Sequence, residues 1–284
     1  MTREITSLTI VFLTIGIVLS STVLADVEIV EEPHSIIPDG VIEQKLINIG
    51  YAEKEILQYD VSWTGGIKLG QLRLEITQLD EIDESYEIKA MLSTKGGAIH
   101  YLYPIDDTHV TRVSGAKRLP YHYEVWQKEG YNYEAHRLIT YDQKNGRIVY
   151  WKNQKLEGKY DVGGEINNEF SSFFNSRIMP HEVDGKFIVP TFADHRRVEV
   201  VVNSVAKTKL KKTLIGTVST TEIMPVLTFE GLYEKKGDTV IWYTDDECRV
   251  PVLINSKIKI GSLTAELVVY ENSACPLYGS IVKR

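Results

Sequence analysis

Cysteine is scarce in this sequence: the 284-residue chain contains only Cys248 and Cys275. Their sequence separation of 27 excludes a Cys-x-x-Cys redox motif. One bridge in a chain of this length can clamp an existing core, but it cannot be the scaffold of the fold. In an oxidising compartment the pair predicts a disulfide, and two separate thiols are the alternative.

Clusters of basic residues are also rare, and the formal net charge is -7. The densest basic run, Lys207 to Lys212, is typical of a solvated hairpin. Proteins dedicated to nucleic acids need clustered lysine and arginine to displace counterions from phosphates. The composition therefore argues against a nucleic-acid partner.

The sequence lacks the motifs of common enzyme and metal classes. It has no Gly-x-Ser-x-Gly elbow and no glycine-rich phosphate loop opening a helix, and its seven histidines avoid the close spacing of zinc ligands. Acids stand near a soft ligand in residues 106–109 and 245–248, where an exposed polar turn explains them better. We therefore expect no metal site, no cofactor and no catalytic residues.

The N-terminus has the pattern of a signal peptide. Arg3 precedes an apolar run over residues 8–19, and small residues then end at Ala25. The run is too short to span a bilayer comfortably, which predicts cleavage after Ala25. An uncleaved anchor is the alternative, because Glu4 dilutes the positive charge of the start. The protein is expected to be exported to the periplasm and to associate with membranes at most peripherally.

Three regions follow from this reading: a signal peptide (1–25), an acidic lead-in (26–54) and a single β-rich domain (55–284). Apolar and polar residues alternate over 57–63, and about a dozen further short segments repeat this two-residue period. No linker rich in Gly, Ser or Pro divides them. The predicted fold is all-β, a single curled antiparallel sheet that forms an open barrel or a β-spiral.

One segment breaks the two-residue period. Apolar residues recur at helical spacing from Ile166 to Ile178, and Pro180 closes the segment. This predicts one amphipathic helix at about 165–178. Its aromatic stripe is expected to plug or lid the barrel, and it consists of Phe170, Phe173 and Phe174.

Two ten-residue strings are alike although they lie near opposite ends of the chain: "IKLGQLRLEI" at 67–76 and "IKIGSLTAEL" at 258–267. In each, the alternation of apolar residues slips by one position at a glycine, Gly70 or Gly261. Such a slip is typical of a β-bulge or a sharp strand bend. We interpret both glycines as bends that curl the sheet; a duplicated functional loop is the alternative.

Three sequence patterns occur together in the chain. The C-terminal pattern is Trp242-x-x-Asp245-Asp246-x-x-Arg249-x-Pro251-Val252, followed by Ile-x-Ile-Gly261-x-x-x-Ala265-Glu266-Leu267. Its counterparts are Tyr59-x-Val61-x-Trp63 and "FSSFFNSRI" at 170–178. Over residues 55–270 these patterns resemble a family of exported Gram-negative envelope proteins catalogued as a domain of unknown function. The resemblance implies a curled antiparallel sheet and brings no catalytic residues.

Within this pattern, Asp245, Asp246 and Arg249 form a candidate polar cluster. They are either an ion-paired turn that fixes strand register or a recognition site. The sequence as a whole predicts a non-enzymatic periplasmic protein that binds an envelope component, either a lipid, a glycan or another protein. A hydrolase of cell-wall polysaccharide and a purely structural or assembly protein are the alternatives.

Overall fold

The computed structural model describes residues 37–228, 239–258 and 261–283, so the predicted signal peptide lies outside the described residues. Within these ranges the helical segments are η2 (Gln44–Leu46), α1 (Ile47–Gly50) and α2 (Glu169–Arg177). The strands are β1 (Lys54–Trp63), β2 (Ile67–Asp80), β3 (Ser85–Ser93), β4 (Asp106–Ser114), β5 (Leu119–Glu129), β6 (Tyr133–Asp142), β7 (Arg147–Lys152), β8 (Lys155–Asp161), β9 (Lys186–Ala193), β10 (Arg196–Thr213), β11 (Gly216–Thr228), β12 (Thr239–Thr244), β13 (Pro251–Lys257), β14 (Ser262–Asn272) and β15 (Ser280–Val282).

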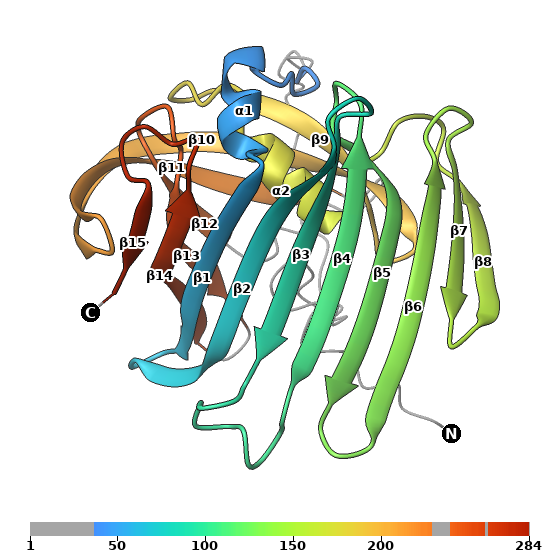
Figure 1. Cartoon of the computed structure of the whole chain (residues 1–284), viewed down its shortest axis with the longest axis horizontal. Coiled ribbons are helices and arrows are strands. Elements are labelled where there is room, and N and C mark those ends of the chain that lie inside the picture. Colours follow the sequence, from blue (N-terminus) through green and yellow to red (C-terminus); the bar gives the residue numbers. More distant parts are fainter. Residues whose placement is uncertain (1–36, 229–238, 259–260, 284) are drawn as a thin grey trace, which may run out of the picture.

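All fifteen strands belong to one antiparallel sheet that curls around a core, as the sequence predicts (Figure 1). The strand order is β8-β7-β6-β5-β4-β3-β2-β1-β14-β13-β12-β11-β10-β9, with β15 paired to β14. The sheet thus consists of two meanders, β1–β8 and β9–β14. They are joined where β1 pairs with β14. The fold class is therefore all-β, an open barrel-like sheet.

The curl brings the two ends of the sheet close together. The rings of Tyr160 in β8 and Phe192 in β9 have centroids 5.2 Å apart. The connecting segment 162–168 fills the remaining space: Asn167 N donates to Pro190 O at 2.8 Å, and Phe192 N donates to Asn167 O at 2.7 Å. The barrel is closed on this side by a connection rather than by a ladder between β8 and β9.

Helix α2 begins where the chain leaves this connection. The side chain of Asn168 accepts from Ser171 N, and the Ser171 hydroxyl accepts from Asn168 N, which is a capping box. The predicted start near 165 is wrong by about four residues, because Asn167 is held in a bridge to Thr191 of β9 and Asn168 serves as the cap. Pro180 follows shortly after the last helical residue.

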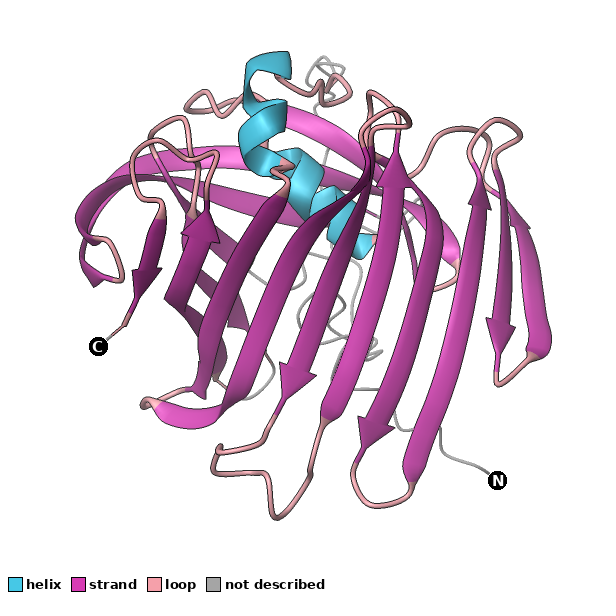
Figure 2. Cartoon of the chain, viewed as in Figure 1, coloured by secondary structure: helices cyan, strands magenta, loops and turns pink. Residues whose placement is uncertain are grey.

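Helix α2 lies on the concave side of the sheet (Figure 2). Six of its nine residues are buried, among them Ser171, Asn175 and Arg177. The predicted helix is present, and most of its polar residues are buried as well and bond to the barrel. Asn175 Oδ1 accepts from Tyr51 Oη at 2.7 Å, and Asn168 Nδ2 donates to the hydroxyl of Thr111 at 2.7 Å.

The three phenylalanines of α2 connect the parts of the core. Phe174 is fully buried, whereas Phe170 and Phe173 are partly buried. Phe170 contacts both the main cluster and a smaller cluster formed by β5, β6, β7 and β9. Phe170 thus lies where the two clusters meet, and the role of the helix as a plug or lid stays a prediction.

A buried ion pair fixes the C-terminal end of α2. Arg177 donates to both carboxylate oxygens of Glu55 in β1, with distances of 2.6 and 2.9 Å. Both side chains are almost fully buried, at 0% and 1% exposure. Arg177 also donates to the carbonyls of Cys248 and Arg249, and Asn272 of β14 donates to Glu55. Every charge is thus compensated, which is what a buried pair requires.

Gly70 is a bulge in β2, as the alternation slip predicts. Val61 of β1 pairs with Gly70, but Ser62 pairs with Lys68, so Leu69 is the extra residue. A Cβ at Gly70 would lie 2.2 Å from the carbonyl oxygen of Ser93. Glycine is needed here because the neighbouring backbone approaches so closely.

Gly261 is not a strand bend, and the interpretation of it as one is wrong. β13 ends at Lys257 and β14 begins at Ser262, so Gly261 belongs to the turn between two strands and has a φ of 86°. The two similar strings nevertheless share a location, because β2 and β14 flank β1 on its two sides. We attribute the likeness of the two strings to this shared position, because β2 and β14 both pair with β1.

The dipeptides Glu129-Gly130 and Asn145-Gly146 favour two-residue hairpin turns. In the structure, the loops of both hairpins are longer. Glu129 faces Tyr133 across a three-residue loop, and Asp142 faces Arg147 across four residues. Two-residue loops would place Trp126 opposite Tyr133 and Tyr141 opposite Tyr150, and the longer loops shift both registers. Trp126 faces His136 instead.

Removing one member of the buried ion pair should be costly. We expect Arg177→Met to lower the free energy of unfolding by about 3–5 kcal/mol, because the Glu55 carboxylate would remain buried without its partner. The matched control is Arg112→Met, which breaks an outer pair with Glu87 and should cost less than about 1 kcal/mol. Equal losses in urea unfolding of the two variants would contradict the role of Arg177.

Gly70→Val should also destabilise the fold, by roughly 3 kcal/mol, because the new side chain meets the backbone of Ser93 and Thr94. Thr77→Val, at an exposed position of the same strand, serves as the control and should change stability little. Thermal unfolding measures both variants. An unchanged melting temperature for Gly70→Val would disprove the need for glycine at the bulge.

Candidate functional site

The polar cluster of the C-terminal pattern forms the turn between β12 and β13. Oδ1 of Asp246 accepts from the hydroxyl of Thr244 at 2.8 Å and from the backbone N of Cys248 at 2.9 Å. Its Oδ2 accepts from Tyr278 Oη at 2.6 Å. Burial, and then the neighbouring Asp246, raise the pKa of Tyr278. Asp246 therefore organises the turn.

Arg249 connects this turn to α2 and to the N-terminal segment. Its guanidinium donates to the carbonyls of Arg177 and Met179 and lies 2.5 Å from a carboxylate oxygen of Glu43. Burial by itself would raise the pKa of Glu43, but hydrogen bonds from Lys45 and Arg249 outweigh it, so the pKa is lowered. These are the contacts of an ion-paired turn.

Asp245 is separate from the other two members of the predicted cluster. Its carboxylate pairs with Lys207 of β10 at 2.8 Å. A polar cavity of about 360 Å³ lies over this turn, lined by residues that include Asp245, Asp246 and His181. The two aspartates of this cavity are thus already engaged in ion pairs or hydrogen bonds. Burial, and then the charge of Arg249, lower the pKa of His181 to about 4.

Cys248 and Cys275 form a disulfide, with their Cα atoms 5.5 Å apart. The bridge ties this same turn to the segment between β14 and β15. The predicted pair is therefore present in the structure, and it lies next to Arg177, which donates to the carbonyl of Cys248. Among the described residues, no group of three or more His, Cys, Asp or Glu is arranged to hold a metal ion.

A buried histidine lies on the inner face of β4. His109 is 6% exposed, shares a hydrogen bond of 2.8 Å with Tyr123 Oη, and contacts the ring of Phe170. Its Nε2 has no hydrogen-bond partner in the structure. Burial, and then the positive charge of Arg137, lower the pKa of His109 to about 3. The side chain is thus a neutral part of the core at neutral pH.

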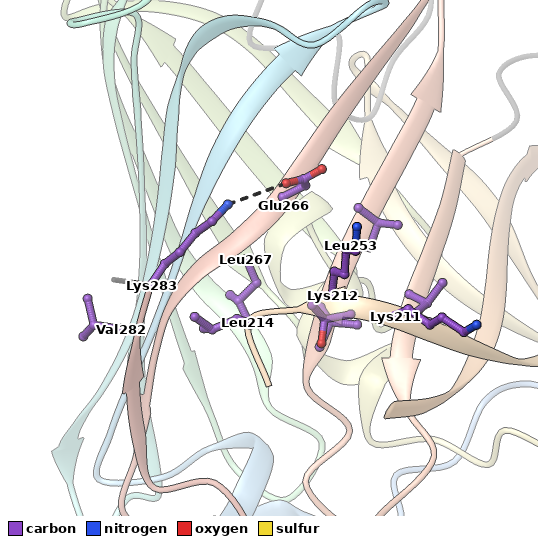
Figure 3. A pocket seen from close by; sticks show the side chains of 11 residues that line it. Lys211, Lys212, Leu214, Leu253, Glu266, Leu267, Val282 and Lys283 are labelled. Atoms are coloured by element: carbon purple, nitrogen blue, oxygen red, sulfur yellow. Dashed lines mark ion pairs between the residues drawn. The ribbon is translucent and has the colours of Figure 1, made fainter. Parts of the chain in front are cut away.

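The feature with the character of a ligand site lies elsewhere, where the end of the β10–β11 hairpin meets β13, β14 and β15 (Figure 3). This groove has a volume of about 290 Å³. It is lined by Leu210, Lys211, Lys212, Thr213, Leu214, Val252, Leu253, Glu266, Leu267, Val282 and Lys283. We call it the lysine groove.

An unusual hairpin end shapes the lysine groove. Hairpin tips are commonly polar, yet the two residues at this tip are Leu214 and Ile215, which pack against the main core. The register of the hairpin shifts between Leu210 and Thr213, and Lys212 has a left-handed backbone with a φ of 62°. This bulge directs the apolar tip toward the core and leaves Lys211 and Lys212 exposed.

The groove has an apolar floor and a basic rim. Leu267 and Val252 are buried, whereas Leu210, Leu214 and Leu253 remain partly accessible. The lysines come from two elements: Lys211 and Lys212 belong to the hairpin, and Lys283 follows β15, with the Lys211 side chain directed away from Lys283 (Figure 3). One carboxylate, that of Glu266, lies 3.9 Å from Lys283. The lining therefore has three positive charges against one negative charge.

Sequence reasoning missed this site. The run from Lys207 to Lys212 is indeed part of an exposed hairpin, as predicted, but its end also forms one wall of a groove. The opposite wall comes from residues about forty to seventy positions later, so no local pattern connects them. The one available signal was the apolar pair Leu214-Ile215 at a position where a polar turn is usual.

Acid should destabilise the protein through His109. An unfolded histidine titrates near 6.5, so stability contributed by the neutral buried ring is present above pH 6.5 and is lost as the pH falls toward 3. We expect the loss of unfolding free energy between pH 7 and pH 4 to be smaller in His109→Phe by about 3 kcal/mol. Urea unfolding of both proteins at each pH measures this difference, and an equal loss would contradict the burial argument.

Two solved structures resemble this chain, and the first of them supports the fold. The beta-barrel-like protein of the domain of unknown function DUF1849 from Brucella abortus is 11% identical, with a TM-score of 0.52, over 77% of this chain and 97% of that chain. The hypothetical protein CT021 from Chlamydia trachomatis is 10% identical, with a TM-score of 0.36, over 84% of this chain and 96% of that chain. No curated protein matches.

The family model described as a protein of unknown function, DUF3108, matches residues 58–268. This is close to the region, 55–270, over which the three sequence patterns resemble a family of unknown function. The matched segment runs from β1 into β14 and includes the ion-paired turn and most of the lysine groove. The chain belongs to the DUF3108 family.

Proposed function

We propose that this protein is a non-enzymatic binding protein of the cell envelope, exported to the periplasm, and that the lysine groove holds an anionic amphiphile. The observation that supports this most is an apolar floor with three lysines at its rim, in a chain whose formal net charge is -7. A hydrocarbon chain would lie against Leu210, Leu214 and Leu253. The acidic head group would meet the lysines.

The size of the groove favours part of a lipid rather than a large solute. Ligand pockets typically measure about 300–1,000 Å³, and this groove lies at the lower end of that range. A single hydrocarbon chain needs less room than a folded glycan, and the floor offers no aromatic ring for a sugar to stack on. Of the three predicted ligand classes, a lipid fits best.

Two further observations support export and the absence of catalysis. The disulfide suits an oxidising compartment. The carboxylates of the polar cavity, Asp245 and Asp246, serve as partners of lysine, hydroxyl and backbone groups, so they are poorly placed to act as a free acid and base pair. No helix within the described ranges is long and apolar enough to cross a bilayer.

Binding of dodecyl phosphate, measured by isothermal titration calorimetry, tests the proposal. We expect the double variant Lys211→Glu with Lys212→Glu to bind at least tenfold more weakly, because about 1.4 kcal/mol of lost charge interaction corresponds to a factor of ten. Lys144→Glu, a charge reversal in the exposed turn between β6 and β7, is the control and should bind like the natural protein.

The neutral analogue dodecanol distinguishes the two halves of the proposal. Dodecanol should bind to the natural protein more weakly than dodecyl phosphate does. Its affinity for the double variant should equal its affinity for the natural protein, because it carries no charge for the lysines to attract. Equal affinity for both compounds would disprove the role of the lysines. Absence of binding by either compound would overturn the lipid assignment and favour a structural or assembly role.

A further inference from the structure

Three large side chains project from one end of the sheet. Tyr101 and Leu102 belong to the loop between β3 and β4 and are 85% and 80% exposed. Tyr131, in the loop between β5 and β6, is 73% exposed. Both loops lie at the same end of the strands, the lower edge in Figure 1. We call Tyr101, Leu102 and Tyr131 the aromatic tip.

Direct contacts join the two loops into one unit. Tyr131 Oη donates to the carbonyl of Tyr101 at 2.5 Å. Gly130 N donates to the carbonyl of Pro104 at 2.7 Å, and a β-bridge links Ile105 with Glu129. The three exposed side chains therefore form one surface rather than separate apolar positions, which would be unremarkable on a soluble protein.

The tip stands on a structured base. Ala98 N donates to the carbonyl of Lys68 in β2, and a Cβ at Gly97 would lie 1.9 Å from the carbonyl oxygen of Leu69. Leu69 is the extra residue of the bulge at Gly70. The bulge in the first of the two similar strings thus seats the loop that carries Tyr101 and Leu102.

The backbone of the tip satisfies many of its own hydrogen-bonding groups. The amides of Leu102 and Tyr103 both donate to the carbonyl of Ile99, at 2.9 and 2.8 Å, and His100 N donates to Gly97 O. The carbonyl of Tyr101 accepts from Tyr131. Unpaired backbone groups are costly away from water, so a compact turn of this kind suits contact with a lipid layer.

Charge also favours a membrane. Residues 93–105 contain no Asp or Glu, although the chain has 39 such residues, and Lys95 and His100 are the only basic groups in this segment. The first exposed acid, Asp106, lies at the base, where β4 begins. Tyrosine combines an apolar ring with a polar hydroxyl and is enriched where membranes meet water. Next to the loop between β5 and β6, the exposed carboxylate of Glu134 lies 3.5 Å from Lys128 Nζ, which offsets its charge toward an anionic lipid surface.

We propose that the aromatic tip inserts into the interfacial layer of a lipid bilayer and docks the protein reversibly on a membrane surface. This inference is independent of the lysine groove, because none of the three tip residues lines it. A docked protein would hold its groove close to a source of lipids. The expected attachment is peripheral, since only three side chains enter the layer.

Co-sedimentation with vesicles of phosphatidylethanolamine and phosphatidylglycerol tests the proposal, using the processed protein purified from the cells that export it. We expect the triple variant Tyr101→Ser, Leu102→Ser and Tyr131→Ser to partition at least tenfold less onto the vesicles. The matched control is Ile82→Ser, which removes a 93% exposed apolar side chain from the turn between β2 and β3 and should bind like the natural protein.

A second variant gives a positive signal. In Leu102→Trp, insertion should shift the tryptophan emission to shorter wavelength when vesicles are added. Equal vesicle binding by the natural protein and the triple variant, or an unshifted Leu102→Trp spectrum, would overturn the proposal. Loss of a protein partner from the triple variant, with no vesicle binding by either form, would show instead that the tip is a protein interface.

The triple variant also separates the two proposals. It should bind dodecyl phosphate as the natural protein does, since the lysine groove is intact. Conversely, the Lys211→Glu and Lys212→Glu double variant should keep its Leu102-dependent response to vesicles. Failure of one property without the other therefore identifies which proposal is wrong.

Discussion

The buried pair of Arg177 and Glu55 is the constraint on which the arrangement of the other parts depends. It joins the end of the internal helix α2 to β1, the strand at which the two meanders meet. Arg177 also bonds to the turn that contains Cys248 and Arg249, and Asn272 brings β14 to the same carboxylate. Because an uncompensated charge in a core is so costly, each of these segments has essentially one acceptable position.

This constraint explains why the strongest sequence pattern has a structural role. Asp246 and Arg249 hold the turn against α2, and the disulfide secures that turn from the other side. Residues of this kind stand out in a sequence because several polar groups must match at once. The surfaces proposed to bind ligands, by contrast, use leucines, lysines and tyrosines that many other side chains could replace without unfolding the protein.

The curled sheet supports two separate surfaces. The lysine groove depends on a bulged hairpin whose apolar tip packs against the main core, and the aromatic tip depends on a bulge in β2 that seats a neighbouring loop. In both, an irregularity in the ladder positions side chains that a regular strand would direct elsewhere. A protein that docks on a membrane with one surface and holds an amphiphile with the other would suit the handling of single lipids.

The sequence by itself determined the all-β class, the helical segment near Phe174, the disulfide pair and the bulge at Gly70. All of these depend on local periodicity, on glycine geometry or on the only pairing that two cysteines allow. It did not determine the start of α2, the hairpin registers or the place of Gly261, since backbone partners from distant strands decide them. Only the tertiary structure decided the two proposed surfaces. Lys212 and Lys283 line one groove because the sheet curls, and Tyr101 and Tyr131 meet because their loops pack together. No pattern along the chain records such proximity.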